Sequence, residues 1–103
     1  MDATFKQQID TLLAQHKVVV FMKGAQTMPQ CGFSARVVQI FNTLGVAFHD
    51  VDILANEQIR TEMKTYSNWP TFPQVYINGE FVGGCDIVTE MYEKGELQPL
   101  VSA

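Results

Sequence analysis

Apolar residues recur along the chain with two different periods, which predict where helices and strands lie. In residues 2–16 they recur every three to four positions, as on an amphipathic helix, and Asp2 is a candidate N-cap. Residues 18–22 (VVVFM) form a continuous apolar run rich in β-branched side chains, which is typical of a strand buried on both faces. Residues 24–30 are mostly polar or small and predict a loop, in which Pro29 stiffens the approach to Cys31.

The next segment repeats this alternation. Residues 34–44 have a helical apolar face and end before Gly45, a residue type that favours the turn after a helix. Residues 46–53 predict a second strand. A strand–helix–strand unit over residues 17–53 predicts two parallel strands joined by a right-handed crossover.

The following residues predict a third helix and then a hairpin. Asn56 is a candidate N-cap for a helix that ends near Tyr66. Two prolines within residues 69–73 (WPTFP) then break the helical pattern. Residues 74–77 predict a strand, and Asn78-Gly79 is a strong hairpin signal, so residues 80–82 should return antiparallel to it.

A last helix is predicted over residues 86–94 and is closed by Gly95, while residues 96–103 either extend that helix or fray. Two parallel strands joined by a crossover and followed by a hairpin predict a four-stranded mixed sheet flanked by helices. That architecture is the thioredoxin fold, of the α/β class. The length of 103 residues allows one such domain over residues 1–103.

Composition and charge exclude several classes of function. With 47% hydrophobic and 17% charged residues the composition is globular. A net charge of −4 with only seven basic residues argues against nucleic acid as a partner. No apolar run approaches the roughly 20 residues that span a bilayer, and no leader is recognisable, so we expect no membrane partner.

The two cysteines are too few for a disulfide scaffold or a self-contained zinc site. This cysteine usage fits a reducing compartment, either the cytoplasm or, if a leader was removed, an organellar matrix.

Cys31 is the main candidate for chemistry, because it lies where a buried strand and a loop lead into a helix. A helix N-terminus presents unpaired N–H groups and partial positive charge, which favour a thiolate, and Lys23 at the strand end would act in the same direction. Ser34 stands where a Cys-x-x-Cys motif would place a second cysteine, so an external thiol would have to resolve a mixed disulfide. The alternative is that Cys31 only packs, as most free cysteines do.

Other candidate residues are ambiguous when taken singly. Pro73 suits a cis peptide bond before a strand. Asp86 follows two glycines at a helix start, where it serves either as an ordinary first-turn acid or beside a ligand. Cys85 either packs or forms a disulfide with Cys31 under oxidation. Arg60, like Lys23, taken alone reads as a solvated charge.

Taken together, these residues resemble the monothiol glutaredoxins that have a Cys-Gly-Phe-Ser active site. The resemblance covers essentially the whole chain and is specific because four segments match in order: FMKG at 21–24, CGFS at 31–34, YSNWPTFPQ at 66–74 and GEFVGGCDI at 79–87.

The resemblance implies a glutathione site. Lys23 and Arg60 would hold the glycine carboxylate, Phe72 would offer backbone groups before a cis Pro73, and the helix start at Cys85 and Asp86 would take the glutamyl end. Glutathione has two carboxylates and one ammonium, which match these cations, the helix N–H groups and Asp86.

The resemblance also implies a 2Fe–2S cluster with Cys31 as a metal ligand. Such a cluster takes four thiolates, which two chains and two glutathiones would supply in a cluster-bridged homodimer for cluster storage or transfer. A BolA-like protein is a possible further partner. The alternative function is a glutathione-dependent disulfide oxidoreductase acting through the Cys31 thiolate alone.

Overall fold

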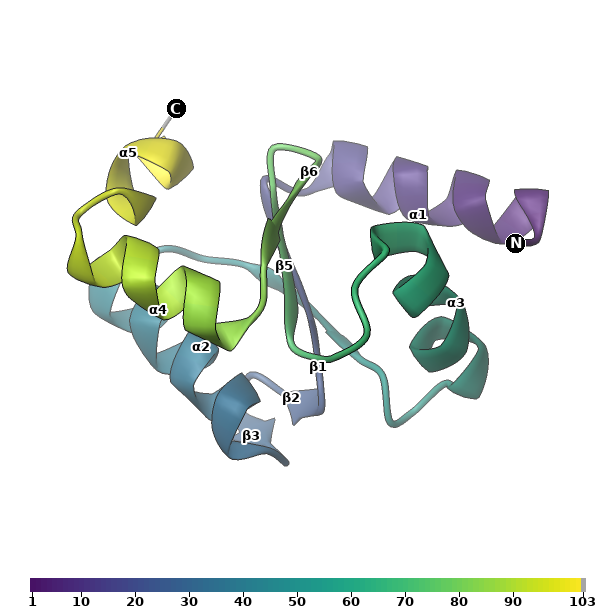
Figure 1. Ribbon diagram of the computed structural model, residues 1–103, viewed down its shortest axis with the longest axis horizontal. Helices are drawn as coiled ribbons and strands as arrows, with labels where there is room; N and C mark the ends of the chain where they lie inside the picture. The colour runs from purple at the N-terminus through teal and green to yellow at the C-terminus, as the bar shows by residue number, and fades with distance from the viewer. Residues whose placement is uncertain (103) are drawn as a thin grey trace.

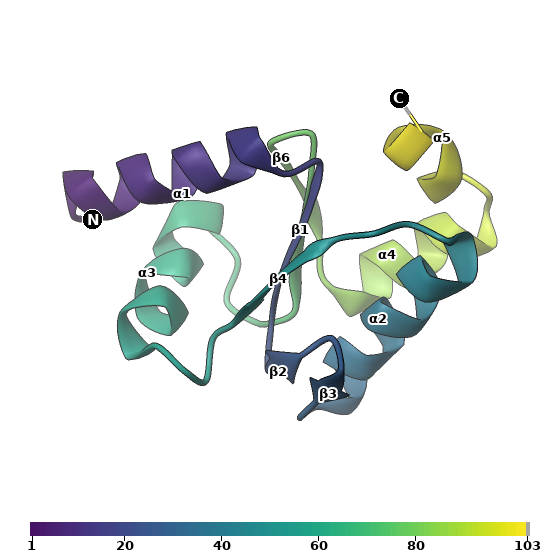
Figure 2. The same ribbon diagram turned by 180° about the vertical axis from the view of Figure 1, so that it is seen from behind.

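The sheet at the centre of the computed structural model, which describes residues 1–102, separates two groups of helices (Figures 1 and 2). Its four strands lie in the order β4-β1-β5-β6, where β1 pairs parallel with β4 and antiparallel with β5, and β5 pairs antiparallel with β6. The strands are β1 (Val18–Met22), β4 (His49–Asp52), β5 (Gln74–Ile77) and β6 (Glu80–Gly83). The predicted thioredoxin fold, with its mixed four-stranded sheet, is therefore confirmed.

The helices cover both faces of this sheet. Helices α1 and α3 pack on one face, while α2, α4 and α5 pack on the other (Figure 1). Their bounds are α1 (Ala3–Gln15), α2 (Gly32–Leu44), α3 (Glu57–Ser67), α4 (Cys85–Glu93) and α5 (Leu97–Ser102). No helix in residues 1–102 is long and apolar enough to cross a membrane.

Strand β1 contributes to both layers of the core, as its unbroken apolar run predicts. Val18, Val20 and Met22 face α2 and α4, while Val19 and Phe21 face α1 and α3, and all five are buried. Burial of each such side chain stabilises the fold by about 1.5–3 kcal/mol. The central strand therefore fixes the position of the residues that follow it, beginning with Lys23.

Several local signals act as the sequence predicts. The side chains of Asp2 and Asn56 accept hydrogen bonds from the backbone N–H groups of Thr4 and Ile59, and so cap α1 and α3. The Asn78-Gly79 turn has positive φ at both residues (53° and 80°), which is the pattern of the predicted hairpin turn.

Most predicted boundaries differ from the structure by at most two residues, and three segments differ more. The expected loop at residues 24–30 contains a small hairpin of β2 (Gly24–Ala25) and β3 (Met28–Pro29). The strand expected over residues 46–53 is only His49–Asp52, because Val46 and Phe48 pack against the core before the pairing with β1 begins. The tail forms a separate helix, α5, after a turn at Gly95 (φ 73°), and Leu97 and Val101 are buried. Ala103 lies outside the described residues.

Candidate functional site

Cys31 is the N-cap residue of α2 and is partly exposed. The backbone N–H of Ser34 is the main cause that lowers the pKa of the Cys31 thiol below its ordinary value. The backbone N–H of Phe33, the charge of Lys23 and the Ser34 hydroxyl act in the same direction, and together they outweigh the opposing effect of burial. The position favours a thiolate, in agreement with its place at a helix start.

Ser34 connects the start of α2 to the end of β1. Its side chain is buried, and its Oγ accepts a hydrogen bond from the backbone N–H of Lys23 at 3.1 Å. The hydroxyl therefore holds the backbone of Lys23, and it also helps to lower the pKa of the Cys31 thiol.

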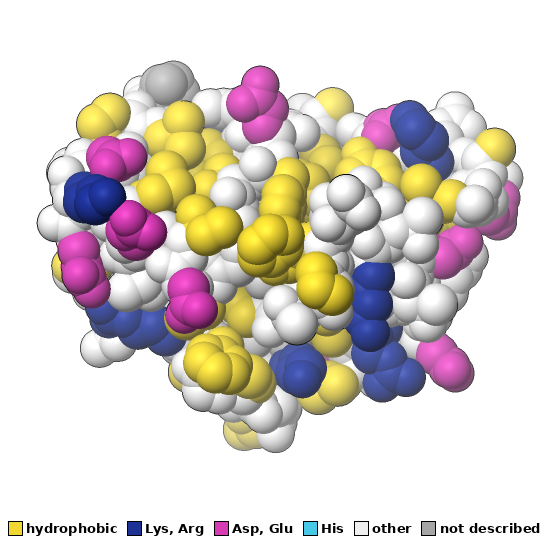
Figure 3. Space-filling view, viewed as in Figure 1, with side chains coloured by type: hydrophobic (Ala, Val, Ile, Leu, Met, Phe, Trp, Pro, Cys, Tyr) yellow, Lys and Arg dark blue, Asp and Glu magenta, His cyan; other side chains and the backbone are white. Residues whose placement is uncertain are grey.

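A pocket of about 530 Å³ opens beside Cys31. It brings together the residues that the sequence predicted for the site. They come from the residue after β1, the N-cap of α2, α3, the loop before β5 and the start of α4: Lys23, Cys31, Arg60, Phe72, Pro73, Cys85 and Asp86. The chain has a net negative charge, yet three of its seven basic residues line this pocket, Lys64 being the third. In Figure 3, Lys and Arg side chains gather beside exposed hydrophobic ones on one part of the surface.

The loop before β5 forms one wall of the pocket, and Gln74 stabilises this loop by hydrogen bonds. This residue is fully buried, and its Nε2 donates to the backbone carbonyls of Trp69 (3.1 Å) and Thr71 (3.2 Å). The peptide bond between Phe72 and Pro73 is cis, a state that the sequence allowed but did not establish. Gln74 thus fixes the turn that carries Phe72 and Pro73 into the pocket.

The opposite wall is the N-terminus of α4. Gly84 is its N-cap, and no side chain within residues 1–102 caps this end, so the first N–H groups of the helix lack intrahelical partners. A β-carbon on Gly84 would lie 3.2 Å from the Pro73 carbonyl oxygen, so a glycine allows the two walls to approach closely. An uncapped helix N-terminus of this kind attracts a carboxylate.

Both cysteines line the pocket as free thiols, and Cys85 Sγ lies 3.9 Å from Thr89 Oγ1. A disulfide between Cys31 and Cys85 under oxidation stays a prediction. In the described part of the chain, no three His, Cys, Asp or Glu side chains are grouped so that they could hold a metal ion.

Sequence reasoning missed Lys64 and Trp69, which also line the pocket. Lys64 lies one helical turn after Arg60 on α3, and this i,i+4 spacing was the available signal. Trp69 was part of the helix-breaking segment and of the matched segment at 66–74, but it was given no role in the site.

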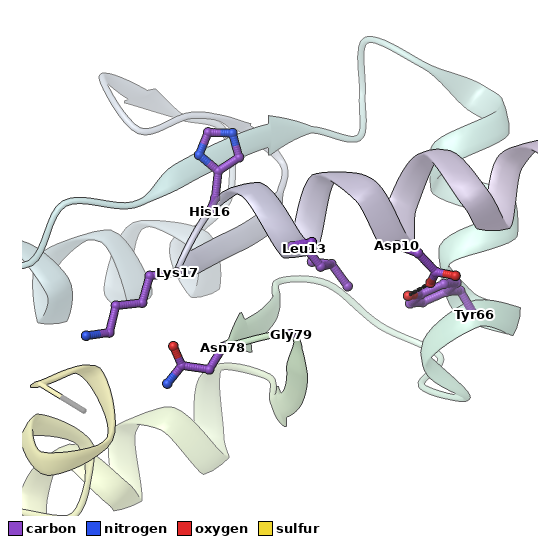
Figure 4. A pocket seen from close by; sticks show the side chains of 8 residues that line it. Asp10, Leu13, His16, Lys17, Tyr66, Asn78 and Gly79 are labelled. Carbon is purple, nitrogen blue, oxygen red and sulfur yellow. Dashed lines mark hydrogen bonds between the residues drawn. The ribbon is translucent and has the colours of Figure 1, made fainter.

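A second pocket, of about 600 Å³, lies where the end of α1 meets the β5–β6 turn (Figure 4). Two of its polar side chains are paired, since the Tyr66 hydroxyl donates to Asp10, which also accepts from Lys6. His16 points away from the other labelled side chains in Figure 4 and stacks on His49, with ring centroids 4.1 Å apart. None of the residues predicted for the site lines this pocket.

A thioredoxin fold that places one thiolate-favouring cysteine beside a cationic pocket is typical of thiol-dependent redox proteins. Comparison with known proteins identifies the family within this class. A family model described as Glutaredoxin matches residues 18–82, and the chain belongs to the glutaredoxin family, in its monothiol group.

The curated relatives include an uncharacterized monothiol glutaredoxin (ycf64-like) of Synechocystis sp., which is 57% identical over 98% of this chain and 94% of its own length. The chloroplastic monothiol glutaredoxin-S7 of Oryza sativa is 58% identical over 87% of this chain, and the match spans 54% of that longer protein.

Solved structures agree in fold. The solution structure of reduced poplar apo GrxS14 has a TM-score of 0.85 and 55% identity, and the match covers 95% of this chain and 90% of that one. A buckwheat glutaredoxin crystallised as a complex with glutathione has a TM-score of 0.85 at 27% identity, covering 96% and 88%.

Proposed function

We propose that the pocket beside Cys31 binds glutathione. The observation that carries this proposal is that one pocket combines a thiolate-favouring cysteine, three cations, an uncapped helix N-terminus and one carboxylate. Glutathione offers the complementary groups: a thiol, two carboxylates and one ammonium. The buckwheat relative was solved with this ligand.

Each residue has a role in this proposal. Lys23 and Arg60 hold the glycine carboxylate by charge-assisted hydrogen bonds. Phe72 and the cis Pro73 offer backbone groups to the middle of the tripeptide. The N–H groups at Cys85 and Asp86 take the glutamyl carboxylate, and the Asp86 side chain takes the ammonium.

Bound glutathione places a second thiol in the pocket that Cys31 lines, and we infer that the two sulfurs together hold a 2Fe–2S cluster as cargo. A 2Fe–2S cluster takes four thiolates. In this proposal each chain supplies two of them, Cys31 and one bound glutathione, so two chains facing each other complete the set. The lowered pKa and partial exposure of Cys31 suit a metal ligand that must be deprotonated and reachable.

The test is anaerobic reconstitution with iron, sulfide and glutathione. The proposal expects a visible charge-transfer absorbance and a shift to a dimer in size-exclusion chromatography, both dependent on glutathione. Cys31→Ser must lose both, while circular dichroism checks that this variant remains folded. An unchanged spectrum in Cys31→Ser would refute the cluster site.

The second candidate function is deglutathionylation by a monothiol route. The Cys31 thiolate attacks the glutathione sulfur of a mixed disulfide, the S–S bond breaks, and the protein thiol leaves. A second glutathione then reduces the Cys31–glutathione disulfide, giving oxidised glutathione. The favouring observation is that Ser34 provides no resolving thiol. Rapid turnover of a glutathionylated substrate by cluster-free protein would favour this function.

Two further expectations follow from the family. A BolA-like partner would supply a histidine in place of one glutathione ligand, and affinity purification that returned no such protein would count against it. We expect this protein to work in a reducing compartment, either the cytoplasm or an organellar matrix. The Oryza sativa relative is named as a chloroplastic protein.

A further inference from the structure

The β2–β3 hairpin lies between Lys23 and Cys31, so its placement sets how these two residues face the pocket. The ends of the hairpin are close together, because the Gln30 N–H donates to the Lys23 carbonyl at 2.8 Å. Gly24 has φ 88°, and a β-carbon there would lie 2.6 Å from the Met28 carbonyl oxygen. The hairpin is therefore tightly closed.

Asp52 supports this hairpin at the point where β1 ends. Met22 is the last residue of β1 and pairs with Asp52, so Lys23 and Gly24 leave the sheet and lose their ladder partners. Asp52 Oδ1 accepts the Gly24 N–H at 2.9 Å, and it also accepts the Leu54 N–H at 2.9 Å. One carboxylate oxygen thus ties the residue after Lys23 to the end of β4.

Asp50 makes a similar bond nearer the tip of the hairpin. Its Oδ2 accepts the Gln26 N–H at 2.7 Å, while Gln26 Nε2 donates to the Phe48 carbonyl at 3.2 Å. Alternate side chains of β4 therefore reach the same hairpin, since residues two apart on a strand point to one face. The hairpin is fixed on β4 from its base to its tip.

We propose that Asp52 is a positioning residue for the glutathione site, acting through Gly24 on Lys23. Hydrogen bonds to a carboxylate are stronger than those between neutral groups. The Lys23 N–H donates to Ser34, and the N–H of the next residue, Gly24, donates to Asp52. These two bonds fix the backbone of Lys23 at the place where this residue lines the pocket. This inference rests on the proposed glutathione site, in which Lys23 binds a carboxylate.

The experiment measures glutathione affinity by titration calorimetry for the wild type, Asp52→Ala and the matched control Asp2→Ala. Asp2 also accepts one backbone N–H bond at 2.9 Å, but at the start of α1. Loss of a charge-assisted hydrogen bond should weaken the affinity of Asp52→Ala about tenfold. Asp2→Ala should bind as the wild type does, and Asp52→Asn, which keeps an acceptor oxygen, should recover part of the affinity.

A double-mutant cycle separates positioning from general destabilisation. If Asp52 acts through Lys23, Asp52→Ala should add less than about twofold to the dissociation constant once Lys23→Gln is present. Additive effects would overturn the proposal. So would an Asp52→Ala variant that melts at lower temperature and binds glutathione like the wild type.

Amide hydrogen exchange gives a measurement that needs no ligand. Asp52→Ala should speed exchange at Gly24 about tenfold, and Asp2→Ala should leave it unchanged. A wild type that does not bind glutathione would overturn the proposed function, and the exchange rate would still decide whether Asp52 holds the hairpin. An unchanged rate at Gly24 in Asp52→Ala refutes the positioning role.

Discussion

Replacing Ser34 with alanine tests the local account of the reactive cysteine. The Ser34 hydroxyl is buried, accepts the Lys23 N–H at 3.1 Å and helps to lower the pKa of Cys31. Alanine removes only the oxygen and its proton, so the change affects the hydrogen bond from Lys23, the stabilisation of the Cys31 thiolate and little packing. We expect the pKa of Cys31 to rise, because one of the groups that stabilise its thiolate is lost.

The cost to stability follows from the same contacts. The Lys23 N–H is partly buried and loses its partner, which costs about 1–2 kcal/mol. For a domain of this size each kcal/mol corresponds to roughly 4–8 °C in Tm, so the expected fall in Tm is roughly 4–16 °C. The variant should remain folded at 25 °C.

The assay is a pH titration of thiolate absorbance in a Cys85→Ser background, so that only Cys31 titrates. Ser67→Ala is the matched control, because Ser67 Oγ also makes two local hydrogen bonds, to the Met63 carbonyl at 2.7 Å and from the Trp69 N–H at 3.2 Å. This control should lower Tm similarly and leave the Cys31 pKa as in the parent.

Alkylation by iodoacetamide at pH 7 gives a second reading, and it should be slower in Ser34→Ala because less thiolate is present. Equal Cys31 pKa values and equal alkylation rates in the Ser34→Ala and Ser67→Ala variants would refute the reasoning. The thiolate would then depend on the helix backbone and the charge of Lys23.

Two further variants test the pocket charge and the hairpin contact. Arg60→Gln should weaken glutathione binding at least about tenfold through loss of a charge-assisted bond, while Arg36→Gln, outside the pocket, should leave calorimetric affinity unchanged. Burial opposes ionisation of Asp50, but hydrogen bonds from Gln26 and from the Asp50 backbone, together with the charge of His49, outweigh it and lower the Asp50 pKa below 3.8. Its contribution is therefore present above pH 3.8 and is lost as pH falls through the lowered folded-state pKa, so Tm in acid should fall less steeply in Asp50→Asn. A steeper fall would contradict this.

The sequence predicted elements whose signals are local. The apolar run of β1, the N-caps Asp2 and Asn56 and the Asn78-Gly79 turn each act through neighbouring residues, and the structure confirms them. Six of the seven residues predicted for the site lie in the four matched segments, and Arg60 lies outside them on α3; all seven line the pocket.

The features that the sequence did not predict depend on distant contacts. Strands β2 and β3 have two residues each, too short to show a period, and they are held by Asp50 and Asp52 from another strand. Helix α5 has six residues and only two buried side chains, too few for a helical pattern. Lys64 resembles any solvated helix charge until the fold places α3 beside Cys31.

Native mass spectrometry of the reconstituted protein tests the central claim most directly, because it counts the components of the cluster site. The account predicts one species that holds two chains, two glutathione molecules and one 2Fe–2S cluster, and predicts that Cys31→Ser does not form it. A cluster held by a single chain, or an assembly of the same mass in Cys31→Ser, would contradict the account.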